Sequence, residues 1–325
     1  MPWPITFDDV LSAAETLQRY LVPTPLRNYP ALDAEVGVRV LVKHENHQPT
    51  NSFKVRNALS ALSALPPDRR RAGVVAATRG NHGLGLAYAG RLLETPVTIC
   101  VPVGNNPEKN RAIRDLGAQL VEEGGSYDDS VAVMEHIARQ RGLTPIHSTN
   151  NAAVIAGAAT ITLEAFRQAA DMGHSIDAVV VAVGGGSQAV GAMTVLRRLH
   201  PAARVFGVQA ERASAIYDSW RAGRPVIHPA ADTFADGIAT RCPYELTFDA
   251  LREGLAGFVL VSEAELAAAV RLMIRTTHNL AEGAGAAGLA GLLKLADDLR
   301  GATVLIVLSG SNIDQHTLRR VMCEY

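Results

Sequence analysis

The sequence predicts an α/β protein built on mostly parallel sheets, and three features of the chain predict it. Short runs rich in β-branched residues recur along its 325 residues. Longer stretches rich in alanine and leucine, with helical spacing, separate these runs. Glycine-rich loops follow several of the runs, at the point where the next helix would begin.

The expected strands and helices alternate along the chain. The strands are expected at residues 38–42, 73–78, 96–102, 178–183, 204–210, 257–262 and 303–310. Helical spacing is clearest over 82–93 and 262–274. In the second of these, Ser262 stands at the expected N-cap and Glu265 at the capping-box position. Short apolar strands that alternate with helices indicate parallel sheets with both faces covered.

Composition and charge exclude several classes of protein. The chain is 48% hydrophobic and 19% charged, which is typical of a soluble globular protein. Its net charge of −1 favours neither nucleic acid nor an anionic membrane as a partner. No apolar run reaches the roughly 20 residues of a membrane span, and the N-terminus lacks a signal-peptide pattern. Three cysteines without a CxxC pair argue against a disulfide framework and fit the cytoplasm.

Four loops carry residues that could do chemistry. They read TRGNHG (78–83), GGGSQAVG (184–191), AEGAGAAG (281–288) and SGSN (309–312). Three glycines after a buried strand let backbone N–H groups converge on an anion, and the next helix adds its positive N-terminus. The loop lacks the lysine of a nucleotide P-loop, so it favours a small phosphorylated cofactor over a plain turn. Taken singly, the other loops could be turns, Ser309 a helix cap and Glu282 a solvated residue.

The stretch NHQPTNSFKVRN (46–57) places Lys54 near the start of an expected helix. Such a lysine is either a solvated helix residue or an amine reserved for covalent chemistry. Residues 47–59, 78–89, 183–191, 281–288 and 308–314, in that order, resemble the threonine dehydratase and serine racemase group of fold-type II pyridoxal-phosphate enzymes. The resemblance runs from about residue 20 to the C-terminus and favours the second interpretation of Lys54.

The resemblance implies a fold like that of the tryptophan synthase β subunit. Two lobes, each with a twisted and mostly parallel sheet flanked by helices, are expected to hold pyridoxal 5'-phosphate between them. Residues 73–148 would form the small lobe, and residues 1–72 plus 149–325 the large one. We expect no C-terminal regulatory domain, and the resemblance implies a homodimer.

The resemblance also assigns roles to the loop residues. Lys54 forms the internal Schiff base with the cofactor and later removes the substrate Cα proton, which requires a primary amine. The expected cofactor contacts are Phe53 on the ring, Asn81 at the ring hydroxyl, Ser309 at the pyridine nitrogen, and Gly184, Gly185, Gly186 and Ser187 at the phosphate. The expected substrate contacts are Ser52, Thr78, Arg79, Gly80 and His82.

The implied reaction is β-elimination from a β-hydroxy amino acid, foremost L-threonine or L-serine, to a 2-oxo acid and ammonia. Arg79 stands where the group usually has serine or alanine. Since a guanidinium is a poor proton donor, serine racemisation is a weaker alternative. Arg79 could instead pair with a second anionic group on the substrate, so 3-hydroxyaspartate remains an alternative substrate. Phenylserine and a hydroxyectoine-derived amino acid are further alternatives. A non-catalytic amino-acid binder is disfavoured, because Lys54 and the phosphate loop are both present.

Two further expectations concern metal and the substrate side chain. Some relatives bind Mg²⁺ or Ca²⁺ through acidic residues after the strand that corresponds to 204–210. Those positions are here Gln209 and Ala215, which lack the carboxylates that hard cations prefer, so we predict no metal site. Asn150, Phe234 and Arg241 are candidates for the pocket of the substrate side chain.

Overall fold

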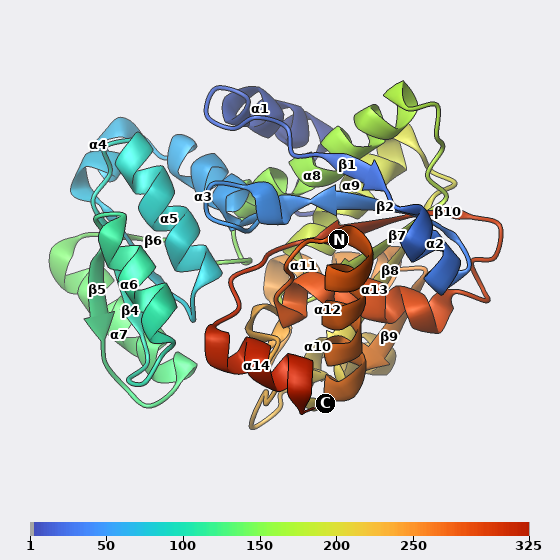
Figure 1. Cartoon of the computed structure of the whole chain (residues 1–325). Helices are drawn as coiled ribbons and strands as arrows, with labels where there is room; N and C mark the ends of the chain where they lie inside the picture. The colour runs from blue at the N-terminus through green and yellow to red at the C-terminus, as the bar shows by residue number, and fades with distance from the viewer. Residues whose placement is uncertain (1–2, 325) are drawn as a thin grey trace.

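The computed structural model describes residues 3–324, which form two sheets flanked by helices (Figure 1). The larger sheet has the order β1-β2-β10-β7-β8-β9, and the smaller sheet has the order β5-β4-β3-β6. All neighbouring strands pair in parallel except β1 and β2, which are antiparallel. The strands are β1 Leu26–Asn28, β2 Arg39–His44, β3 Val74–Ala77, β4 Val97–Val101, β5 Gln119–Glu122, β6 Thr144–Pro145, β7 Ala178–Ala182, β8 Arg204–Ala210, β9 Gly257–Val261 and β10 Thr303–Leu308.

The helices cover both faces of the sheets. They are α1 Phe7–Leu17, α2 Pro30–Val36, α3 Lys54–Ser63, α4 Pro67–Ala72, α5 Asn81–Leu92, α6 Pro107–Asp115, α7 Tyr127–Arg141, α8 Ala152–Asp171, α9 Ser187–Leu199, α10 Ala215–Ala222, α11 Glu245–Gly254, α12 Glu263–Thr277, α13 Gly283–Leu295 and α14 Gln315–Cys323, with short 3₁₀ turns at Glu45–His47, Glu211–Ala213 and Asp236–Ile238. The α/β class and the seven expected strands are confirmed. The sequence missed β1, β5 and β6, which have four residues or fewer and so carry little periodicity.

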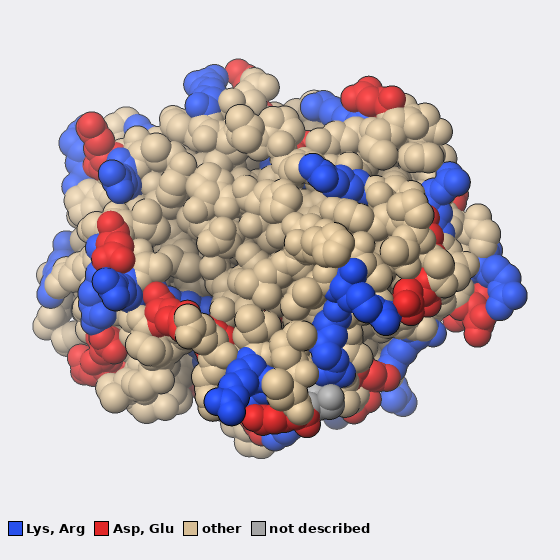
Figure 2. All heavy atoms as spheres, viewed as in Figure 1, with Lys and Arg blue, Asp and Glu red and all other residues tan. Residues whose placement is uncertain are grey.

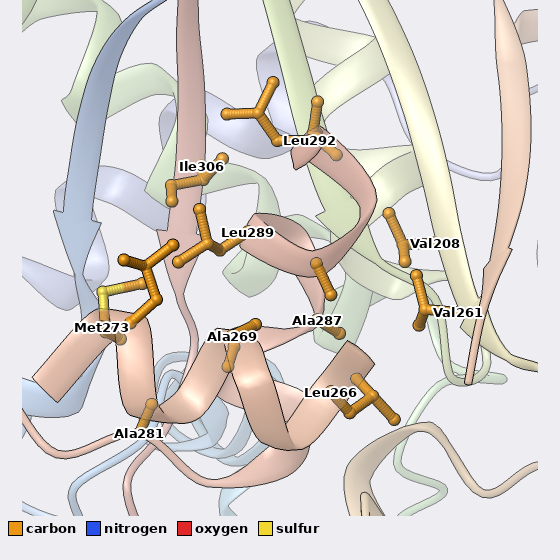
Figure 3. Close-up of a cluster of buried hydrophobic side chains, with 14 of the residues drawn as sticks. Val208, Val261, Leu266, Ala269, Met273, Ala281, Ala287, Leu289, Leu292 and Ile306 are labelled. Carbon is orange, nitrogen blue, oxygen red and sulfur yellow. The ribbon is translucent and has the colours of Figure 1, made fainter. Parts of the chain in front are cut away.

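The strands of the larger sheet divide their side chains between two cores, as the period of two requires. On β2, Val40 and Val42 pack with α2, α12 and α13, whereas Leu41 packs on the opposite face with α1, α8 and α9. The first core includes Leu289 and Ile306, and Figure 3 shows α12 and α13 packed over this face of the sheet. The larger sheet is therefore a middle layer between two layers of helices.

The smaller sheet is also covered on both faces. Val74 and Ala76 of β3 pack with residues of α3 and α5, while Val75 packs with Ile137 of α7. Helix α3 lies before residue 73, yet Leu59 belongs to the core of the smaller sheet. The lobe boundaries at 73 and 148 stay a prediction.

A stripe of glycines lets α13 lie directly on the larger sheet. A Cβ at Gly285 would stand 2.1 Å from the carbonyl oxygen of Gly310, and one at Gly291 would stand 2.2 Å from a methyl of Val208. Gly288 lies between them, and its Cβ would stand 3.0 Å from the carbonyl oxygen of Val180. The close approach of helix and sheet thus depends on the missing side chains.

A network of buried charges joins β2, α3 and α8. The Arg56 guanidinium donates to both carboxylate oxygens of Glu45, at 2.8 and 2.9 Å, and to Glu164 at 3.0 Å. Lys43 donates to Glu164 at 2.5 Å and to the Thr24 carbonyl at 2.6 Å. Burial alone would raise the pKa of Glu45, but Arg56 holds it below its usual range. Both members of the Arg56–Glu45 pair are therefore charged inside the protein.

The surface carries charges of both signs. Figure 2 shows basic and acidic side chains spread around the visible face, with uncharged surface between them. This agrees with the net charge of −1. Among residues 3–324, none of the helices combines the length and the apolar character that crossing a bilayer requires.

The capping box expected at the start of α12 is confirmed. Ser262 Oγ accepts from the Glu265 amide at 3.2 Å, and the Ser262 amide donates to the Glu265 carboxylate at 2.7 Å. Loss of an N-cap hydroxyl leaves a helix amide without its partner. We expect Ser262→Ala to lower the free energy of unfolding by about 1 kcal/mol in denaturant titrations. Ser12→Ala, at an exposed site in α1, is the control, and equal stability of the two variants would contradict the prediction.

Candidate active site

A cavity of about 140 Å³ lies where the carboxyl ends of strands from both sheets meet. Thr78 follows β3, Gly184 follows β7 and Ser309 follows β10, and all three line the cavity. Lys54, the first residue of α3, lines it as well. Ligands of open α/β sheets bind at such an edge, so this cavity is the candidate active site.

The cavity brings together nearly all of the residues singled out in the sequence. Those that line it are Phe53, Lys54, Thr78, Arg79, Gly80, Asn81, His82, Gly184, Gly185, Gly186, Ser187 and Ser309. Ser52 does not line it. That residue is fully buried, and its backbone forms a bridge with Gly310, so it supports the wall of the cavity. The individual roles given to these residues stay predictions.

Lys54 presents an amine to the cavity. Its Nζ donates to the Ser148 carbonyl at 3.4 Å and lies 4.8 Å from the centre of the Phe53 ring. Burial lowers the pKa of Lys54 to about 8, against the opposing effect of Glu282. Near neutral pH the side chain therefore has a useful fraction of unprotonated amine, which is the form that attacks a carbonyl.

This pKa gives a testable pH dependence. In protein freed of cofactor, we expect the rate at which added pyridoxal 5'-phosphate attaches to Lys54 to rise with pH up to about 8 and then level off. An ordinary lysine has a pKa of 10.5, so its rate would keep rising well beyond that point. The measurement is the visible absorbance change after mixing, with Nα-acetyl-lysine as the control. A rate that follows the control across the range would contradict the lowered pKa.

The loop after β7 forms a cradle for an anion. Gly186 is the N-cap of α9 with φ of +96°, a left-handed conformation that favours glycine. A Cβ at Gly184 would stand 2.4 Å from the carbonyl oxygen of Gly237, and one at Gly185 would stand 2.3 Å from Thr149 Oγ1. Glycines thus keep the loop compact, and the N-terminus of the 13-residue helix α9 supplies unpaired N–H groups. This loop can bind a phosphate, and the Lys54 amine can react with an aldehyde. The lining therefore suits pyridoxal 5'-phosphate, which carries both groups.

A polar group lies beside the lysine. Asn81 Nδ2 donates to Glu282 Oε1 at 2.6 Å, and Asn312 Nδ2 donates to Asn81 Oδ1 at 2.8 Å. Glu282 is buried, so the alternative that it is simply a solvated residue is wrong. Burial raises its pKa, while Lys109 and Asn81 act in the opposite direction. These bonds fix the orientation of the Asn81 amide. Its expected contact with the hydroxyl of the cofactor ring stays a prediction.

Ser309 does not cap the last helix. The N-cap of α14 is Asp314, whose carboxylate accepts from the Thr317 amide at 2.8 Å. Ser309 instead lines the cavity, and its hydroxyl donates to the Ala284 carbonyl at 3.3 Å. Its expected contact with the pyridine nitrogen stays a prediction.

The His82 side chain is neutral near pH 7. Burial, and then the nearby Lys54, lower the pKa of His82 to about 3. Its Nε2 lies 3.0 Å from the Ile146 carbonyl, which can only accept, so Nε2 carries the proton. Its Nδ1 has no partner in the described part of the chain.

Several lining residues were missed in the sequence. Tyr127, Tyr244, Lys109 and Asp236 line the cavity, and the Lys109 amine pairs with the Asp236 carboxylate at 3.1 Å. Each stands alone in its stretch of sequence, outside the glycine-rich loops. Lys109 and Asp236 are 127 residues apart, so no local pattern could have joined them.

The candidates for the substrate side-chain pocket lie elsewhere. Asn150 Oδ1 accepts from the Leu246 amide at 3.0 Å, and Arg241 pairs with Asp128. Phe234 lines a neighbouring polar cavity. None of the three candidates lines the cavity beside Lys54, and their contact with the substrate side chain stays a prediction.

The positions considered for a metal hold no carboxylate. Gln209 Oε1 accepts from the Tyr217 amide at 3.0 Å, and Ala215 begins α10. Within residues 3–324 there is no group of three or more His, Cys, Asp or Glu side chains placed to hold a metal ion. The expected absence of a metal site stays a prediction.

A lysine at a helix start and a glycine-rich phosphate cradle, in one cavity between two mostly parallel sheets, define the site of a pyridoxal-phosphate enzyme. The family model described as "Pyridoxal-phosphate dependent enzyme" matches residues 17–310. The chain belongs to this family, and its cofactor is pyridoxal 5'-phosphate.

Three relatives show which members of the family are similar. A protein of Thermotoga maritima named L-threonine ammonia-lyase is 36% identical over 318 residues, which cover 98% of this chain and 78% of that protein. A protein of a Pseudomonas species named L-threo-3-hydroxyaspartate ammonia-lyase is 35% identical and covers 95% of this chain and 96% of its own length. The crystal structure of serine racemase from Dictyostelium discoideum has a TM-score of 0.88 at 29% identity, with 96% of this chain and 99% of that one covered. The resemblance to the threonine dehydratase and serine racemase group is thereby confirmed.

Proposed function

We propose that this protein is an ammonia-lyase that converts a β-hydroxy amino acid, foremost L-threonine or L-serine, into a 2-oxo acid and ammonia. The observation that carries the proposal is the placement of the Lys54 amine, with a pKa of about 8, in the same cavity as the cradle of residues 184–187. The named ammonia-lyases at about 35% identity support the same reaction class.

The positions of the residues in the cavity support the roles that we propose for them. Pyridoxal 5'-phosphate, when bound, supplies an aldehyde for the substrate amine and a conjugated ring that accepts the electrons released from Cα. Lys54 takes the Cα proton, for which a pKa near the working pH is suitable. The Ser148 carbonyl orients that amine. The hydroxyl leaves from Cβ as water, and hydrolysis of the resulting enamine releases ammonia, so water is lost once and taken up once.

We infer that the 78–81 turn binds the substrate carboxylate. The Gly80 amide donates to Thr78 Oγ1 at 3.0 Å, which holds the turn. Arg79 is exposed and lines both the active-site cavity and its polar neighbour. A guanidinium stays charged at any working pH, so Arg79 binds anions and does not return a proton to Cα. This favours elimination over racemisation.

A second candidate substrate is 3-hydroxyaspartate. Two cationic side chains, Arg79 and Lys109, line the cavity in addition to Lys54. Lys109 is paired with Asp236, which leaves Arg79 as the better partner for a second carboxylate. The Pseudomonas relative named for this substrate is about as similar to the chain as the threonine enzyme.

The test is release of 2-oxo acid and ammonia from a panel of substrates. The panel contains L-threonine, L-serine, the threo and erythro forms of L-3-hydroxyaspartate, and phenylserine. Release from threonine or serine supports the main proposal. Release from hydroxyaspartate alone, with a kcat/KM for that substrate that falls on Arg79→Ser, supports the second candidate. Inversion of recovered serine without 2-oxo acid would replace both with a racemase.

Three further expectations concern the oligomeric state, the location and the lobes of the protein. We propose a homodimer, a cytoplasmic location, and a division into lobes near residues 73 and 148. The three cysteines of the chain are all free, which suits a reducing compartment. Sedimentation of the purified protein tests the oligomeric state.

A further inference from the structure

The segment that leaves the smaller sheet after β6 and enters α8 contacts the active site at consecutive residues. The Ser148 carbonyl accepts from Lys54 Nζ at 3.4 Å. The Thr149 side chain fills the space where a Cβ of Gly185 would stand. Residues 147–151, here called the hinge turn, therefore touch both the lysine and the phosphate cradle.

The next two residues fasten the hinge turn to the larger sheet's helices. Asn150 Oδ1 accepts from the Leu246 amide at 3.0 Å, which holds the start of α11. Asn151 is the N-cap of α8, and its Oδ1 accepts from the Val154 amide at 3.1 Å. The hinge turn thus contacts Lys54 through Ser148 and the phosphate cradle through Thr149. Its last two residues, Asn150 and Asn151, bond the first turns of α11 and α8.

One side chain holds the shape of the hinge turn. His147 Nδ1 lies 3.0 Å from the Thr149 amide and 2.8 Å from the Asn150 amide, and it accepts from both. This is the geometry by which an Asn or Asp oxygen holds an Asx turn, here made by a ring nitrogen. The His147 ring also packs edge-on against Tyr244, with ring centres 4.6 Å apart. Tyr244 itself lines the cavity.

The protonation state of His147 suits this role. Burial, and then the charge of Lys54, lower the pKa of His147 to about 4. The ring is therefore neutral near pH 7, and its Nδ1 lone pair is free to accept. The proton of the neutral ring must be on Nε2, since Nδ1 accepts.

We propose that His147 is a positioning residue of this active site: its Nδ1 holds the hinge turn, and the hinge turn sets the Lys54 amine relative to the phosphate cradle. The inference rests on the proposed function, because it assumes that the cofactor joins Lys54 while its phosphate lies in the cradle. His147 itself does not line the cavity. It acts through Ser148 and Thr149.

The experiment compares two substitutions at His147 with a matched control. His147→Leu removes the acceptor and keeps an apolar body of similar bulk, while His147→Asn offers Oδ1 to the same two amides. His136→Leu is the control, because His136 is exposed on α7. Each cofactor-free protein is titrated with pyridoxal 5'-phosphate, the lysine adduct is fixed with borohydride, and the modified peptide is identified by mass.

We expect His147→Leu to weaken cofactor binding by about tenfold or more, the effect of losing one to two hydrogen bonds. We expect the visible absorption band of the bound cofactor to shift in this variant as well. His147→Asn should restore affinity and spectrum to nearly the wild-type values, and His136→Leu should leave both unchanged. Wild-type behaviour of His147→Leu would overturn the proposal. Equal damage by leucine and asparagine would also overturn it, since ring packing on Tyr244 would then be the cause.

A measurement on the unaltered protein covers the case in which His147→Leu does not fold. The ¹⁵N shift of His147 should show an unprotonated, hydrogen-bonded Nδ1 at neutral pH, and the amides of Thr149 and Asn150 should exchange slowly with solvent. A protonated Nδ1, or fast exchange at both amides, would refute the role. If the unaltered protein forms no adduct at Lys54, the proposed function fails and this inference fails with it. If it forms the adduct and only the His147 results disagree, the proposed function stands.

Discussion

Lys54→Ala is expected to abolish covalent attachment of the cofactor and to lower 2-oxo-acid release by at least about 10³-fold. A positioned acid–base group contributes roughly 10²–10⁴-fold, and here the same amine also binds the cofactor. The other lysine in the cavity, Lys109, is paired with Asp236 and has a pKa that is raised rather than lowered. It is therefore a poor replacement for Lys54.

The chain allows a clean control for this variant. It contains four lysines, so borohydride trapping and mass analysis can assign the attachment site without ambiguity. Lys294→Ala removes an amine that pairs with Glu265 on the surface, and it should keep full activity. An adduct on Lys109, or activity retained by Lys54→Ala, would contradict the assignment of Lys54 as the lysine that binds the cofactor.

Arg56→Met is expected to lower the free energy of unfolding by about 3–5 kcal/mol, the usual cost of leaving one member of a buried ion pair behind. Glu45 is fully buried, and Arg56 is its guanidinium partner at 2.8 Å. Methionine fills much of the arginine volume, so the lost pairing dominates over a cavity. Urea or guanidinium titration measures the loss.

The control for Arg56→Met is the same substitution at an arginine whose ion pair is exposed to solvent. Arg300 pairs with Asp297 at 2.6 Å, and both side chains are almost fully exposed. Arg300→Met should cost less than about 1 kcal/mol. The double variant Arg56→Met with Glu45→Gln should recover part of the loss, because no buried charge is then left unpaired. A similar cost for Arg56→Met and Arg300→Met would contradict the buried pairing.

The sequence predicted those parts of the fold and site that are encoded locally. Apolar runs such as 178–183 and 303–310 are long enough to show that they are strands, and the loops that follow them reach the cavity because parallel strands share one carboxyl edge. The run of glycines at residues 184–186 indicated an anion cradle by itself. Lys54 was singled out by the family resemblance, and the need for a primary amine agrees with that choice.

The rest of the site depends on contacts between distant residues. His147 shows this clearly, since a single histidine in a linker carries no pattern and its role is visible through its bonds to the Thr149 and Asn150 amides. The Lys109–Asp236 pair arises where α6 meets the 3₁₀ turn Asp236–Ile238, more than a hundred residues further along the chain. Arg241 pairs with Asp128, a partner 113 residues away in the sequence, and does not line the cavity.

The glycine stripe of α13 has a consequence for mutational scanning. The same helix begins directly after Glu282, and the Gly310 carbonyl that Gly285 approaches follows directly after Ser309. Any side chain at Gly285 or Gly291 pushes the helix off the sheet and separates two walls of the ligand site. A library screened for activity will therefore record these positions as intolerant as Lys54, although neither lines the ligand cavity. Only a parallel screen for folded protein distinguishes such scaffold positions from chemical ones.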